Sequence, residues 1–153
     1  MKYWLTVHWP PTLDGARVQG GIWLQEGKED VGRNLSRDDL VFIYETRTGR
    51  PREDKLGYWP GGQGIVALVE VVDVNLEQAF TLSHEAYSDG SELLWKMVAR
   101  TRPIDVTHFC SHDDTCDCLE YSRNYFFRGF GRSKSGLREL TKSEFGCLRN
   151  HFR

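Results

Sequence analysis

Long apolar runs are missing from this sequence, and nothing in it approaches the roughly 18 consecutive apolar residues that a membrane-spanning helix needs. The apolar stretch within residues 1–10 is too short for a secretory signal peptide, so we expect a reducing cytoplasm as the compartment and no membrane partner. Cysteine is scarce, at 4 in 153 residues, which is too few for a disulfide scaffold. These absences exclude a membrane-spanning protein and a small secreted disulfide-rich protein.

Catalytic motifs are also missing. The chain has no Gly-x-Ser-x-Gly elbow, no His-Glu-x-x-His pair and no carboxylate–lysine pattern with nuclease spacing. Its acidic residues are scattered along the chain rather than clustered. We therefore expect a binding module, with a small-molecule enzyme kept as a more distant alternative.

The composition is that of an ordinary globular chain, with 39% hydrophobic and 27% charged residues, and the length fits a single domain over residues 1–153. The formal net charge of −2 hides an asymmetry. Residues 121–153 hold eight Lys and Arg against two acids, whereas residues 1–120 hold 12 against 20. A basic end on an acidic body favours a polyanion-binding patch, although a solvated helix face explains the charge equally well.

Several strands and one clear helix can be predicted. Aromatic and β-branched runs predict strands over 3–9, 40–46, 65–74 and 93–101, with a short strand over 124–127. A short surface helix is expected within 27–39, and polar loops over 47–63 and 107–120. At the end of the chain, Thr141 and Glu144 have the spacing of a capping box, and Phe145, Leu148 and Phe152 form an apolar stripe. These elements indicate a closed or nearly closed sheet capped by helices.

Six short motifs in this order resemble the EVE domains of the PUA-like superfamily, which is related to YTH and ASCH domains. They are Lys2-Tyr3-Trp4-Leu5, Gly21-Ile22-Trp23, Phe42-Ile43-Tyr44, the strand Gly64 to Val71, Trp95-Lys96-Met97-Val98 and the segment Leu140 to Phe145. The resemblance covers nearly the whole chain. It departs from the family at Ala67, at His8, in the loop 47–63 and in the Cys/His segment 107–120. It implies an α+β fold, a PUA-like mixed β-barrel flanked by short helices.

The resemblance also implies a function, namely binding of a flipped, modified base of DNA in the barrel pocket, as the reading domain of a modification-dependent restriction system. We expect 5-methyl- or 5-hydroxymethylcytosine as the base and DNA as the partner. The chain is expected to be either a complete small protein or part of a longer one that carries a nuclease, so a fused or separate nuclease is the second candidate partner. The alternative is a module that binds modified RNA. Flipping costs a few kcal/mol of lost stacking, which about two or three aromatic side chains could restore.

Aromatic and polar residues near strand ends are the candidates for such a pocket. We expect an aromatic cage, with Trp23 as its best wall and polar groups at the strand ends to set selectivity. The full candidate set is Trp23, Tyr44, Trp59, Tyr58, Trp9, His8, Thr6 and Asp38. Core packing is the competing interpretation for the aromatic residues, except Trp59, for which it is a surface position that pins the loop. For each polar residue it is a role in a turn or on the surface.

Cations in the basic end are the candidates for phosphate contacts, since they alternate with glycines and hydroxyls. They are Arg123, Arg128, Arg132, Lys134 and Arg138. An ordinary basic turn is the alternative.

One segment combines soft metal ligands. Cys110, His112, Cys116 and Cys118 lie within nine residues and could hold a structural zinc ion, although their spacing is tighter than in most zinc sites. A solvated polar loop without any cofactor is the alternative, and Cys147 stands off the apolar stripe of the last helix with no evident role.

Overall fold

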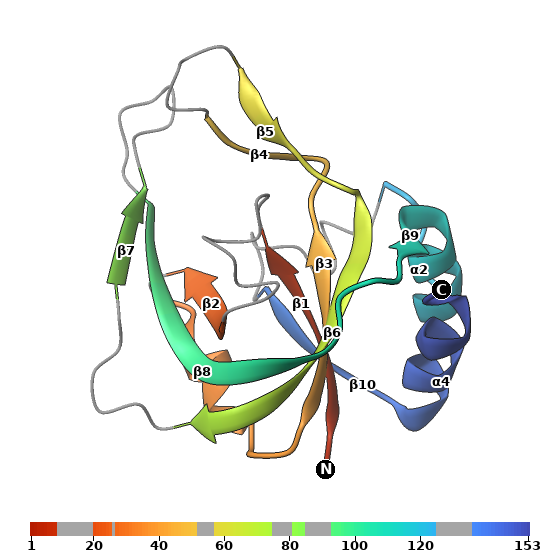
Figure 1. Ribbon diagram of the computed structural model, residues 1–153, viewed down its shortest axis with the longest axis horizontal. Helices are drawn as coiled ribbons and strands as arrows, with labels where there is room; N and C mark the ends of the chain where they lie inside the picture. Colours follow the sequence, from red (N-terminus) through yellow and green to blue (C-terminus); the bar gives the residue numbers. More distant parts are fainter. Residues whose placement is uncertain (9–19, 26, 52–56, 75–80, 85–92, 125–135) are drawn as a thin grey trace.

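The computed structural model describes residues 1–8, 20–25, 27–51, 57–74, 81–84, 93–124 and 136–153 (Figure 1). Its strands are β1 (Tyr3–His8), β2 (Gly21–Gln25), β3 (Leu40–Glu45), β4 (Thr48–Pro51), β5 (Tyr58–Pro60), β6 (Gly64–Val74), β7 (Thr81–His84), β8 (Leu93–Asp105), β9 (Cys110–Ser111) and β10 (Leu137–Leu140). The helices are the 3₁₀ helix η1 (Glu29–Asn34) and the α-helices α2 (His112–Leu119) and α4 (Lys142–His151).

The main sheet is mixed and strongly curled. Its strand order is β10-β1-β3-β6-β8-β2, with β7 also paired to β8 and β9 to β6. Strands β1 and β3 are parallel, while the other pairs are antiparallel. Figure 1 shows the sheet wrapping around an interior, with α2 and α4 stacked together outside it. The expected α+β class with a barrel-like sheet and flanking helices is confirmed.

Side-chain alternation on the strands separates two cores. The first, which we call the convex core, lies between the sheet and the helices and contains Leu5, Phe42, Ile65 and Leu148. The second, the concave core, lies inside the curl and draws residues from six strands. Its members are Trp4, Ile22, Leu24, Leu35, Val41, Ile43, Val66, Ala67, Val69, Val71, Ala99 and Leu137.

Helix α4 begins as the sequence predicts. The Thr141 hydroxyl accepts a hydrogen bond from the backbone N–H of Glu144 at 3.1 Å, and the Glu144 carboxylate accepts one from the N–H of Thr141 at 2.8 Å. This reciprocal capping box satisfies two backbone donors at the helix start. The predicted stripe then packs on the sheet: Phe145 stacks on Tyr3 with 4.1 Å between ring centroids, and Leu148 is fully buried.

Three regions differ from expectation. The supposed loop 47–63 contains a two-stranded hairpin of β4 and β5, and the helix expected within 27–39 is only the short η1. The segment 107–120 forms β9 and α2, because Ser111 caps the helix through the N–H of Asp114 at 3.1 Å. The strand expected over 124–127 lies almost entirely outside the described residues. In the part of the chain that the structure describes, no helix is long and apolar enough to cross a membrane.

Candidate functional site

The carboxyl ends of the parallel strands β1 and β3 place two buried polar residues side by side. His8 is the last residue of β1 and pairs in register with Glu45, the last residue of β3. Trp4 and Val41 belong to the concave core, so alternation turns His8 and Glu45 to the same concave face. Both side chains are buried, with exposures of 0% for His8 and 4% for Glu45. At the carboxyl ends of β1 and β3, the hydrophobic concave core is therefore bordered by an imidazole and a carboxylate.

His8 carries the unusual feature of this site. Neither Nδ1 nor Nε2 has a hydrogen-bond partner within the described ranges of the chain, although the residue is fully buried. Desolvation by burial lowers the pKa of His8 from 6.5 to about 3, so the ring is neutral at physiological pH. A neutral imidazole offers one N–H donor and one nitrogen acceptor. Buried polar groups are normally hydrogen-bonded, so a fully buried ring with two unpartnered nitrogens is an exception.

Glu45 was not among the residues expected from the sequence. Its Oε1 accepts a hydrogen bond from the backbone N–H of Gly62 at 3.0 Å, which ties the end of β3 to the turn before β6. The alternation of Val41, Ile43 and Glu45 in a buried strand could have indicated an acid on the inner face. What the sequence could not supply is the register that sets Glu45 beside His8.

The other two polar candidates have structural roles. Thr6 is buried on the same face of β1 as His8, and its hydroxyl donates a hydrogen bond to the carbonyl of Gly136 at 2.7 Å. Asp38 is exposed, has a left-handed φ of 73°, and precedes β3 at the amino end of that strand, away from His8. Asp38 is therefore a turn residue, and its assignment to the base-binding set is corrected.

Trp23 lies on the other face of its strand. Its neighbours Ile22 and Leu24 are both buried in the concave core, so the half-buried indole turns outward from it. A Cβ built on Gly21 would lie 3.0 Å from both the indole Nε1 and the side chain of Met97. The Gly-x-Trp step therefore has a packing reason, since the glycine leaves room for the ring. Trp23 and His8 do not face a common space.

Tyr44 is a core residue, which corrects the expectation that it lines a cage. The side chain is 0% exposed in the convex core, and its hydroxyl lies 2.8 Å from Nδ1 of His112 on α2. The His112 Nε2 lies 3.2 Å from the carbonyl oxygen of Arg123, which can only accept, so Nε2 donates. In the neutral ring, Nδ1 then accepts the hydrogen bond from the tyrosine. Burial, with a smaller contribution from Cys116, raises the pKa of Tyr44 above its ordinary value.

The remaining aromatic candidates stay predictions. Tyr58 and Trp59 lie on β5 of the hairpin, which Figure 1 shows beyond the carboxyl ends of β1 and β3. Trp9 directly follows His8 and lies outside the described residues. The described residues thus bring Thr6 and His8 together but separate them from Trp23, Tyr44 and Asp38.

Two of the five expected phosphate ligands are paired with carboxylates of the protein. Arg123 contacts Asp113 and Asp117, with Nη1 2.7 Å from the latter, and Arg138 lies 2.8 Å from Glu144. These ion pairs compete with any phosphate contact. The other three, Arg128, Arg132 and Lys134, fall outside the described residues, and their assignment stays a prediction.

The expected zinc set does not assemble. Cys118 forms a disulfide with Cys147, so Cys118 has no thiolate to offer a metal. Cys147 is therefore not the incidental residue that the sequence indicated. The Cys110 thiol is buried and lies 3.5 Å from the Thr115 hydroxyl. Residues 112–119 form helix α2 rather than a loop that could wrap an ion, and although Cys116 lies 3.6 Å from His112, no three of these four ligands come together. The assignment of Cys110, His112, Cys116 and Cys118 as one metal site is corrected.

A separate hollow of about 280 Å³ opens between the turn before β6 and the start of α2. It is lined by Gly62, Gln63, Phe109, Ser111, His112 and Asp113. Because α2 covers the convex face of the sheet, this hollow is distinct from the concave site at His8.

The overall architecture has a solved counterpart. A crystal structure of an Agrobacterium tumefaciens protein matches at a TM-score of 0.53 and 17% sequence identity, over 99% of this chain and 93% of that chain. The likeness is one of fold alone. An NMR structure from Rhodopseudomonas palustris (TM-score 0.48, 14% identity, 99% and 93% coverage) and a crystal structure from Pseudomonas putida (0.45, 14%, 97% and 97%) are too weakly similar to add to it. No protein-family model matches the sequence, and no curated protein matches it significantly.

Acidification should reveal the buried state of His8. The unfolded chain protonates this residue near pH 6.5, whereas the folded protein holds it neutral down to about pH 3. The unfolded state therefore binds more protons between these values, and the free energy of unfolding should fall with decreasing pH, by at most about 1.4 kcal/mol per pH unit. Urea unfolding at stepped pH, compared with His8→Leu, checks this. Parallel curves for the two proteins would show that His8 titrates normally.

Proposed function

We propose that this protein is a non-catalytic nucleic-acid reader that binds one flipped, modified base, a 5-substituted cytosine of DNA, on the concave face of its curled sheet. The observation that carries the proposal is the fully buried His8, whose ring nitrogens have no partner in the described part of the chain. An unsatisfied buried polar group costs roughly 1–3 kcal/mol, which a ligand that hydrogen-bonds to it would recover.

The chemistry of the site fits the edge of a cytosine. The Watson–Crick edge presents an exocyclic amine donor and acceptors, and flipped bases are read there by hydrogen bonds. A neutral His8 can donate to the acceptor, while the Glu45 carboxylate, which has several acceptor positions, can receive the amine. The mixed curled sheet and the sequence resemblance to EVE domains of the PUA-like superfamily both support a base-binding barrel.

Stacking and phosphate contacts are assigned to the remaining candidates. Tyr58 and Trp59 of strand β5, in the hairpin beyond the strand ends, are the candidates for stacking on the base. Arg128, Arg132 and Lys134 are the candidates for phosphate contacts. Burial of one methyl group contributes only about 0.8 kcal/mol, so selectivity for the modification must rest on shape or on an added polar group.

The test is a binding panel at fixed salt. Fluorescence anisotropy would measure the affinity of the protein for labelled DNA duplexes that carry one central cytosine, 5-methylcytosine or 5-hydroxymethylcytosine. The matching RNAs would be measured in the same way. We expect the modified DNA to bind most tightly. His8→Leu should weaken that binding by about tenfold or more, the value of a lost hydrogen bond, while the fold is retained.

Trp23→Ala is the matched control, because Trp23 faces away from the concave side, and it should change binding little. Equal affinity for modified and unmodified DNA would overturn the proposal. Tighter binding of modified RNA would replace DNA by RNA as the partner. Loss of selectivity in Trp23→Ala alone would move the base to the outer face of β2.

A further inference from the structure

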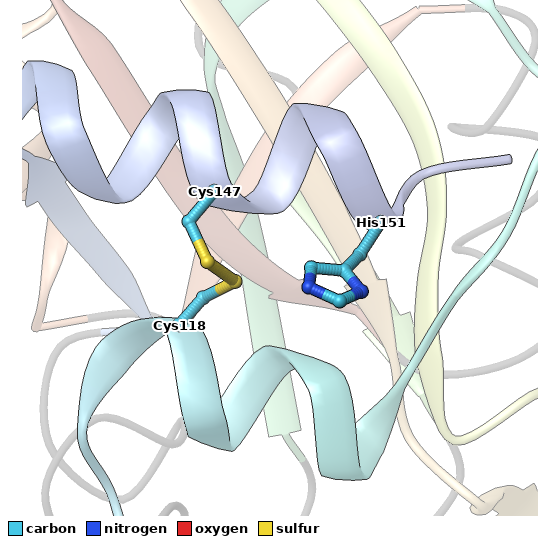
Figure 2. A group of neighbouring side chains, drawn as sticks. All are labelled: Cys118, Cys147 and His151. Carbon is cyan, nitrogen blue, oxygen red and sulfur yellow. A yellow bond between two sulfur atoms is a disulfide. The ribbon is translucent and has the colours of Figure 1, made fainter.

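The contact between α2 and α4 brings together four side chains that can bind or support a metal. Asp114 and Cys118 are four residues apart on α2, and Cys147 and His151 are four apart on α4, so each pair lies on one helix face. Cys118 and Cys147 form a disulfide, and the ligand atoms of Cys118, Cys147 and His151 all lie within 4.8 Å of one another. Figure 2 shows the His151 ring beside the disulfide, between the two helices.

The ligand types are those of zinc. Two cysteine sulfurs and one imidazole nitrogen form a soft set that suits a tetrahedral Zn²⁺ with one open position. Nδ1 of His151 lies 3.7 Å from Oδ1 of Asp114, just beyond hydrogen-bond distance, so a carboxylate lies near the ring nitrogen that the metal would not use and could orient the histidine. Cys118 is buried, Cys147 is half-buried and His151 is exposed, so an ion can enter from solvent.

We propose that the reduced forms of Cys118 and Cys147, together with His151, bind Zn²⁺, with Asp114 holding His151 in place. The disulfide and the metal site exclude each other, because a metal needs thiolates. A dithiol or a trialkylphosphine supplies the two electrons. With the phosphine, the S–S bond breaks, water supplies the oxygen of the phosphine oxide, and two thiols form. Zn²⁺ then displaces the two thiol protons.

Among the described residues, no other three His, Cys, Asp or Glu side chains lie close enough together to hold one metal ion. The Cys116 sulfur lies 3.6 Å from Nε2 of His112, but that imidazole already bridges Tyr44 and the carbonyl of Arg123. The proposed metal site therefore lies between α2 and α4 and not within the segment 110–118.

Cobalt(II) is the probe, because thiolate ligation gives it a charge-transfer absorption. The protein is reduced with a trialkylphosphine, the reductant is removed in the absence of oxygen, and the free thiols are counted. The reduced protein should bind one Co²⁺ ion and show this absorption, and Zn²⁺ should displace the Co²⁺. The oxidised protein should not bind Co²⁺. His151→Ala and Asp114→Asn should each weaken binding at least tenfold. His108→Ala, an exposed histidine paired with Asp105, is the matched control and should leave binding unchanged.

Equal cobalt binding by oxidised and reduced protein would overturn the proposal, as would binding without the charge-transfer band. Loss of the band in Cys116→Ser but not in Cys147→Ser would return the site to the α2 segment. The two variants at exposed or half-buried positions, His151→Ala and Asp114→Asn, decide the question if a cysteine variant fails to fold. The test contains no nucleic acid, so its outcome is independent of the proposed function.

Discussion

Gly64→Ala is expected to destabilise the fold by about 3 kcal/mol. Gly64 begins β6 and pairs with Ser111 of β9, and it does not adopt a positive φ, so the effect is one of space alone. A Cβ at this position would overlap the carbonyl oxygen of Cys110 and lie 2.6 Å from Cζ of Phe109. The oxygen belongs to the paired backbone of β9 and cannot move without breaking that pairing. Chemical denaturation of both proteins measures the change.

Gly146→Ala is the control for this substitution. Gly146 lies inside α4, and a Cβ there would meet nothing within 4 Å. Alanine should therefore stabilise the protein by about 0.5–1 kcal/mol, since glycine is the weaker helix former. If the two substitutions shift the denaturation midpoint equally, the close approach of β9 to β6 is wrong.

Asp39→Asn should cost about 3 kcal/mol, through the loss of a buried carboxylate that joins three segments. Asp39 is 1% exposed, and its two oxygens accept hydrogen bonds from the backbone N–H of Lys2, the indole N–H of Trp4 and the backbone N–H of Ser36, all between 2.8 and 2.9 Å. In either orientation of the amide, its NH₂ group faces a donor. Hydrogen bonds to a charged group contribute roughly 1.5–3 kcal/mol each.

Asp38→Asn is the matched control at the neighbouring position. Asp38 is exposed, and asparagine tolerates its left-handed φ of 73°, so the free energy of unfolding should change by less than about 0.5 kcal/mol. Thermal and urea unfolding of the two variants would separate the roles of these adjacent carboxylates. Equal effects would mean that Asp39 does not anchor the amino end of β1.

Local sequence patterns predicted the strands and the helix whose formation depends on residues close together in the chain. The runs that became β1, β3 and β6 are rich in β-branched and aromatic residues, and α4 begins at a capping box whose partners are three residues apart. The prediction failed where a weaker local signal was overlooked. Ser111, followed by Asp113 and Asp114, is an N-cap with acidic residues in the first turn, yet the segment was expected to be a loop.

The candidate site could be predicted only in part, because it depends on which face of each strand turns inward. His8 and Tyr44 were candidates for their positions at strand ends, and Trp23 for its place in the Gly-x-Trp step of the EVE resemblance. Alternation within β3 and β2 turns Tyr44 to the helices and Trp23 outward, while His8 faces the interior. The two-residue alternation of side chains along a strand determines which residues share a face of the sheet. It does not determine which of the two faces is enclosed.

The sequence by itself determined the long strands β1, β3, β6 and β8, the capped last helix and the α+β class, since these follow from interactions between residues a few positions apart. Tertiary structure alone decided the pairing of His8 with Glu45 across parallel strands, and that of Cys118 with Cys147 over 29 residues of chain. The physical reason is that sheet curvature, strand register and helix packing bring distant side chains together, and no local spacing encodes those distances.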